Sequence, residues 1–157
     1  MRIYLVQHGA ALAKDVDPAR PLSEQGEQDV RRIAAFLASP GVGVGRIWHS
    51  GKRRAEQTAE LLAAALPPHP KPEARAGMDP DDPTDTLAYD VTGWDHDTMI
   101  CGHLPFMARL SARLLTGRED GAAIGFTPGT VACLERTGER QFTMRWMISP
   151  DLLRGNA

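Results

Sequence analysis

Three times along this chain, a short apolar run typical of a buried strand passes through a polar or glycine turn into a stretch with helical spacing. The runs cover residues 2–7, 46–49 and 98–101. Strands that alternate with helices in this way form a mostly parallel sheet with helices on both faces. The chain is therefore predicted to have an α/β fold.

The expected helices carry recognisable start and stop signals. Ser23 suits the N-cap of the first helix, and Ser-Pro-Gly at 39–41 ends it. Its apolar stripe is formed by Val30, Ile33, Ala34 and Leu37. A second helix is expected after Ser50-Gly51, with an inner face of Ala55, Thr58, Ala59, Leu62 and Leu66. Pro105 is expected at the first position of a third helix, which packs through Phe106, Met107, Leu110 and Leu114.

The remaining segments complete one domain over residues 1–157. Four prolines between residues 67 and 72 predict an extended surface connector, and residues 84–91 are compatible with a short helix. Two apolar runs at 130–134 and 142–148, joined through Gly138, indicate a hairpin. We expect a three-layer sandwich whose mostly parallel sheet carries this antiparallel hairpin at one edge.

Composition excludes several classes of function. A net charge of -2 argues against a general nucleic-acid binder. No stretch approaches the roughly 20 apolar residues of a membrane helix, and the first strand begins at once, without the apolar core of a signal peptide. We expect a cytoplasmic, monomeric protein with no nucleic-acid or membrane partner. Cys101 and Cys133 lie in separate strand-like runs and are expected to be buried free thiols.

Each strand-to-helix junction carries groups suited to phosphate: Gln7-His8-Gly9, then Ser50 with Arg54, then Gly102-His103. In an open α/β sheet these junctions lie at one edge, so the groups are expected to converge. One neutral imidazole can attack phosphorus, a second imidazolium can stabilise charge, and a guanidinium can bind two oxygens. Backbone N–H groups at Gly9 and at helix starts near Ser50 and Leu104 would add donors for the anion. This set favours phosphoryl transfer through a covalent intermediate.

Four ordered motifs then suggest a family: LVQHG at 5–9, RPLSEQG at 20–26, SGKRRAEQT at 50–58 and GHLP at 102–105. Together they resemble the histidine phosphatase superfamily, and specifically its short SixA-type phosphohistidine phosphatases. The resemblance covers nearly the whole chain and implies a phosphoglycerate mutase-like fold. It implies that His8 becomes phosphorylated, that Arg54 and His103 bind and polarise the phosphoryl group, and that no metal ion or organic cofactor is required. The expected partner is a phosphohistidine-bearing protein or a small phosphorylated substrate.

The chain departs from the family pattern at Gln7, where the signature usually has arginine, and at Ala10-Ala11, where close relatives often have an acidic residue. Glutamine retains a donor but removes one positive charge, which predicts weaker binding of an oxyanion. Arg20 either reaches the rim of the pocket or faces solvent, and we include it among the phosphate-binding candidates with Gln7, Gly9, Ser50 and Arg54.

Two other functions remain open from the sequence. A small-molecule phosphomonoesterase would need an acid for its leaving group, and Asp79 or Asp81 would have to supply it, although their setting among prolines favours a solvated turn. A phospho-ligand binding module without turnover is the other alternative, suggested by Gln7 alone. The remaining histidines lack the ligand spacing of a zinc site: His69 and His96 are expected at the surface, and His49 beside the pocket.

Overall fold

The computed structural model describes residues 1–155 and builds one six-stranded sheet from them, in the order β3-β2-β4-β1-β5-β6. The strands are β1 (Arg2–Gln7), β2 (Arg46–His49), β3 (Glu73–Ala74), β4 (Thr98–Gly102), β5 (Val131–Gly138) and β6 (Gln141–Ile148). The first four are mutually parallel, β5 is antiparallel to β1, and β6 is antiparallel to β5. The predicted α/β fold with an antiparallel edge hairpin is confirmed.

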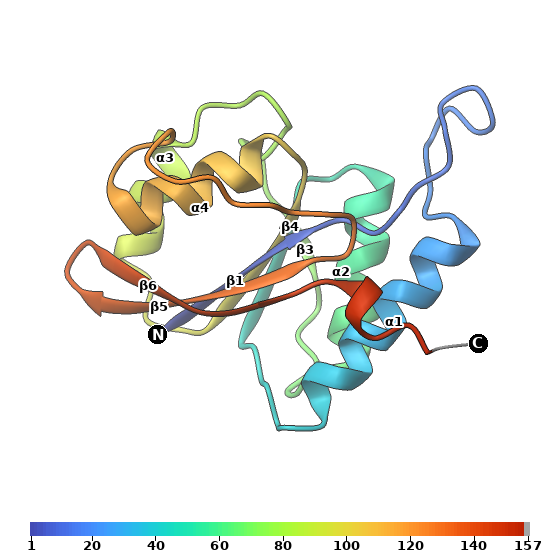
Figure 1. Cartoon of the computed structure of the whole chain (residues 1–157), viewed down its shortest axis with the longest axis horizontal. Helices are drawn as coiled ribbons and strands as arrows, with labels where there is room; N and C mark the ends of the chain where they lie inside the picture. The colour runs from blue at the N-terminus through green and yellow to red at the C-terminus, as the bar shows by residue number, and fades with distance from the viewer. Residues whose placement is uncertain (156–157) are drawn as a thin grey trace.

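Helices cover both faces of this sheet (Figure 1). On one face, α1 (Glu24–Ala38) and α2 (Arg53–Ala65) bury a core that includes Tyr4 and Val6 of β1. On the other, α3 (Asp85–Thr92) and α4 (Phe106–Thr116) bury a second core that includes Ile3 and Leu5. Because β1 has apolar side chains on both faces, it can lie only at the centre of the sandwich. The three predicted layers are confirmed.

Local signals explain most element boundaries. The Ser23 hydroxyl accepts a hydrogen bond from the N–H of Gly26 at 3.0 Å and caps α1, as predicted. Directly after the proline connector, the structure has a strand that was not predicted, β3, because its two residues are exposed and carry no apolar pattern. Pro105 is the N-cap of α4 rather than its first residue, so α4 begins at Phe106.

After β6, a short 3-10 helix, η1 (Pro150–Leu152), packs near α1. Within residues 1–155, none of the helices combines the length and the apolar character needed to cross a lipid bilayer. Cys101 and Cys133 are buried free thiols, as expected from their strand positions.

Candidate active site

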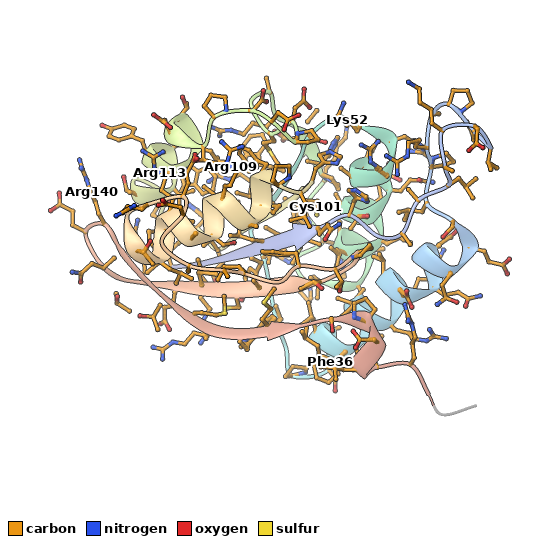
Figure 2. The ribbon with its side chains drawn as sticks, turned by 45° about the horizontal axis from the view of Figure 1, so that its top comes forward. Phe36, Lys52, Cys101, Arg109, Arg113 and Arg140 are labelled. Atoms are coloured by element: carbon orange, nitrogen blue, oxygen red, sulfur yellow. The ribbon has the colours of Figure 1, made fainter. Side chains whose placement is uncertain are left out.

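The two histidines that follow β1 and β4 meet at one edge of the sheet. The strands are adjacent and parallel, with Gln7 opposite Gly102. His8 and His103, which follow these two residues, therefore lie beside each other. The ring centroids of His8 and His103 are 5.0 Å apart. Both rings and Arg54 of α2 line one pocket, whose other walls are formed by Gln7, Ala10, Ala11, Arg20, Pro80, Leu104 and Pro128. In Figure 2, Lys52 marks this edge at the start of α2, and Cys101 lies within the sheet.

His8 presents an unprotonated nitrogen for attack. Its Nδ1 lies 2.7 Å from the carbonyl oxygen of Gly9. A carbonyl can only accept, so Nδ1 carries the ring proton and Nε2 carries the free lone pair. Burial, with smaller contributions from the charges of Arg54 and Arg20, lowers the pKa of His8 to about 4 against the opposing effect of the Gly9 hydrogen bond. The imidazole is therefore neutral at pH 7, as a nitrogen nucleophile must be.

His103 is 1% exposed and bonds through Nε2 to the hydroxyl of Ser50, 2.6 Å away. Its Nδ1 is buried without a hydrogen-bond partner. Burial first, and then the neighbouring His8 and Arg54, lower the pKa of His103 to about 3. The sequence predicted an imidazolium at this position. An imidazole with this pKa becomes charged near neutral pH only if a bound anion raises its pKa.

Two arginines supply the positive charge of the pocket. Arg54 has a buried Nε without a hydrogen-bond partner, and burial, followed by repulsion from Arg20, lowers its pKa. Arg20 adopts a φ of 47°, and its Nε donates to the carbonyl of Leu12 at 3.1 Å, which holds the guanidinium in the pocket wall. Of the two positions left open by the sequence, the structure favours the pocket rim.

Gln7 also lines the pocket and is 8% exposed. Its Oε1 is buried without a hydrogen-bond partner. Gln7 adds polarity to the pocket without a full charge, in agreement with the sequence expectation. The cationic character of the site therefore rests on Arg54 and Arg20.

Two predicted phosphate contacts are not made in the expected way. The N–H of Gly9 donates to Thr58 Oγ1 at 3.0 Å, so it is not free for an anion. Glycine is required here for space: a Cβ would lie 2.8 Å from a methyl carbon of Val30. Ser50 is not part of the pocket wall, because its hydroxyl contacts His103 instead. The helix start expected at Leu104 is also wrong, since α4 begins two residues later behind Pro105, which has no N–H.

Sequence reasoning missed two residues that hold the pocket together. Gln57 Oε1 accepts a hydrogen bond from the N–H of Leu22 at 2.7 Å and fixes the segment after Arg20. The Thr58 hydroxyl accepts from Gly9 and donates to the carbonyl of Arg54 at 2.8 Å. The available signal was Thr58 itself, a polar residue on an otherwise apolar helix face. Pro80 and Pro128 line the pocket without any sequence signal for that position, and Leu104, which was expected there as a helix start, lines it as well.

Asp79 and Asp81 lie outside the pocket wall, and both are exposed. The N–H of Asp79 donates to a carboxylate oxygen of Asp82 at 2.8 Å, and the N–H of Asp82 donates back to the Asp79 carbonyl at 3.1 Å. These bonds form the expected turn. Among the residues that the structure describes, no carboxylate lines the pocket.

Comparison with known proteins agrees with this geometry. A family model for the histidine phosphatase superfamily (branch 1) matches residues 3–77. Phosphohistidine phosphatase SixA of Escherichia coli (strain K12) is 26% identical over 155 residues, which cover 96% of this chain and 94% of SixA. A structure of the protein histidine phosphatase SixA complexed with tungstate has a TM-score of 0.86 and 26% identity, over 98% of this chain and 100% of that chain.

A more distant structure, a phosphoserine phosphatase of Entamoeba histolytica with 3-phosphoglyceric acid, has a TM-score of 0.70. It is 14% identical and covers 94% of this chain and 96% of its own, so it shares the fold alone. The chain thus matches the histidine phosphatase superfamily over residues 3–77 and is similar to SixA over nearly its whole length, and these similarities indicate a phosphatase.

Proposed function

We propose that this phosphatase removes the phosphoryl group from phosphohistidine on a protein, through a covalent phosphohistidine on His8. The observation that carries the proposal is the composition of the pocket wall. It combines a neutral histidine nucleophile with two guanidinium groups, and no carboxylate lies in it among the described residues.

The proposed reaction has two steps. In the first, the lone pair of His8 Nε2 attacks phosphorus, and the P–N bond of the substrate breaks. The substrate ring takes that electron pair and leaves as neutral imidazole, because its other ring nitrogen is already protonated. In the second, a water oxygen attacks the phosphorus on His8, and the new P–N bond breaks with its electron pair returning to Nε2. The ring is again neutral with its proton on Nδ1, and both protons of the water leave with the phosphate as dihydrogen phosphate. Arg54, Arg20 and Gln7 hold the phosphoryl oxygens, and His103 donates to the oxygen that gains charge.

The leaving group decides between substrate classes. An alkyl phosphate ester must leave as an alkoxide and needs a positioned acid to protonate it. The ester alternative requires Asp79 or Asp81 as this acid, but both are exposed and lie outside the pocket wall. Asp79 lies in a turn, 3.9 Å from the ammonium of Lys52. An imidazole leaves without such an acid, so the wall around His8 suits a phosphoramidate bond better than an ester.

Phosphate release from four substrates tests the proposal: a phosphohistidine protein, phosphoramidate, a phosphoserine peptide and a small phosphate ester. We expect turnover of the first two, with little release from the esters. His8→Ala should reduce turnover by roughly three orders of magnitude or more. His96→Ala is the matched control, because His96 is exposed and lies outside the pocket wall.

Each contrary result would contradict a different part of the proposal. Preferential turnover of esters would contradict the phosphohistidine assignment and favour the small-molecule phosphomonoesterase. Saturable binding of phosphate without release from any substrate would favour the binding module. Unchanged turnover in His8→Ala would exclude His8 as the nucleophile.

A further inference from the structure

His49, the last residue of β2, is a buried imidazole beside the pocket that the proposed reaction does not use. It is 4% exposed. Its Nδ1 accepts a hydrogen bond from the N–H of Gly51 at 3.1 Å. Because a backbone N–H can only donate, the ring must be neutral and must carry its proton on Nε2. Gly51 has a φ of +93°, a conformation that favours glycine, so the bond forms across a tight turn.

The turn held by His49 carries Ser50, which contacts His103. The N–H of Lys52 donates to Ser50 Oγ at 3.3 Å, and the same oxygen lies 2.6 Å from His103 Nε2. The hydroxyl hydrogen is then available to be donated to Nε2. In that arrangement the ring proton of His103 resides on Nδ1, the buried atom that has no hydrogen-bond partner in the structure.

We propose that His49 is a positioning residue for His103. By holding the N–H of Gly51, it fixes the turn so that Ser50 donates to His103 Nε2 and the Nδ1–H of His103 is offered to a phosphoryl oxygen. The inference rests on the proposed function of the pocket. In this proposal Ser50 sets the tautomer of His103 and does not contact the phosphate directly.

The surroundings of His49 keep its ring in the form that accepts. The carbonyl of His49 takes a hydrogen bond from the N–H of Arg75 at 2.8 Å, which fixes the backbone of the residue beside β3. From α2, Glu56 and Glu60 raise the pKa of the imidazole, but burial outweighs them and lowers it. A protonated ring would carry a hydrogen on Nδ1 and would lose the bond to Gly51.

The test compares two variants of similar size. The carbonyl oxygen of asparagine in His49→Asn can take the place of Nδ1 as the acceptor, whereas His49→Leu has no acceptor. Nitrogen NMR of the His103 ring reports its tautomer, and tungstate serves as the anion probe. We expect the wild type and His49→Asn to keep the Nδ1–H tautomer. In His49→Leu we expect a mixture of tautomers, roughly tenfold weaker tungstate binding and a fall mainly in kcat.

Ser50→Ala tests whether His49 acts on His103 through Ser50. If His49 acts through Ser50, the double variant His49→Leu/Ser50→Ala should be no worse than Ser50→Ala alone, because the effects of coupled residues do not add. Additive losses would overturn the proposal. So would an unchanged His103 tautomer and tungstate affinity in His49→Leu, or equal losses in His49→Asn and His49→Leu.

Misfolding of the leucine variant and failure of the proposed function can each be told apart from failure of the His49 proposal. If His49→Leu does not fold, His49→Gln replaces it, since its longer amide reaches toward the Nε2 position rather than Nδ1. If the wild type releases no phosphate from any substrate, the proposed function fails. The tautomer and tungstate measurements still decide the role of His49, because neither requires turnover.

Discussion

At the scale of single residues, Gln7 determines how strongly the pocket attracts an anion. It lies in the pocket wall, where the family signature usually has arginine, and its Oε1 is buried without a partner. Arg54 and Arg20 are left as the cations of that wall. A charge-assisted hydrogen bond is roughly twice as strong as a neutral one, so the identity of this one side chain affects affinity directly.

Gln7→Arg is therefore expected to tighten tungstate binding by about tenfold, equivalent to ~1.4 kcal/mol. Isothermal titration calorimetry at low and high salt measures the change, and the gain should shrink as salt screens the added charge. Gln7→Met is the control for side-chain size without charge. Equal or weaker binding by the arginine variant would contradict the account of the missing charge.

His8, Arg54 and His103 were predictable from sequence because each lies at a strand end or in a motif, and parallel strands bring such positions together. Gly9 and Ser50 were predicted at the right place with the wrong contacts. Their partners, Thr58 and His103, lie 49 and 53 residues away, and sequence periodicity carries no information on such hydrogen bonds. The exposed strand β3 escaped prediction because only backbone pairing with β2 defines it.

At the scale of elements, the start of α1 is packed directly against the segment that follows His8. A Cβ at Gly26 would lie 1.9 Å from the carbonyl oxygen of Ala10. The same oxygen accepts hydrogen bonds from the N–H of Ser23 at 2.9 Å and from its hydroxyl at 3.2 Å. The cap of α1 therefore also positions the pocket wall. This contact explains why serine and glycine occur at 23 and 26 in the RPLSEQG motif.

Gly26→Ala should lower the free energy of unfolding by about 1–3 kcal/mol, because the backbone of the Ala10 segment must move. The loss outweighs the gain of up to ~1 kcal/mol in helix propensity. Urea unfolding measures the difference, and Gln28→Ala, at an exposed position of the same helix, provides the control. A more stable Gly26→Ala protein would show that the contact is not restrictive.

At the scale of the whole molecule, three histidines make stability depend on pH. The pKa of His8 falls to about 4 and that of His103 to about 3, and the pKa of His49 is also lowered. Unfolded histidines titrate near 6.5, so the unfolded chain binds more protons than the folded chain below that pH. Acid therefore favours unfolding, in a window that begins near pH 6.5 and continues down to the folded pKa values.

Between about pH 6 and pH 5, each of these histidines is expected to lower the free energy of unfolding by up to ~1.4 kcal/mol per pH unit. Urea unfolding across this range measures the slope. His8→Gln should have a smaller slope than the wild type, because one proton fewer is taken up on unfolding, whereas the non-titrating control Gln28→Ala should match the wild type. Identical slopes in all three proteins would contradict the lowered pKa of His8.

The central position of β1 has a consequence for synthesis of the chain. The strand that precedes His8 is translated before both of its partners, since it pairs with Thr98–Gly102 on one side and with Val131–Glu135 on the other. A nascent chain therefore exposes His8 and the unpaired edges of an apolar strand until β4 and β5 have been translated. Contacts of such sequence separation form slowly. Premature termination before β5 would thus yield an inactive chain with an open strand edge available for aggregation.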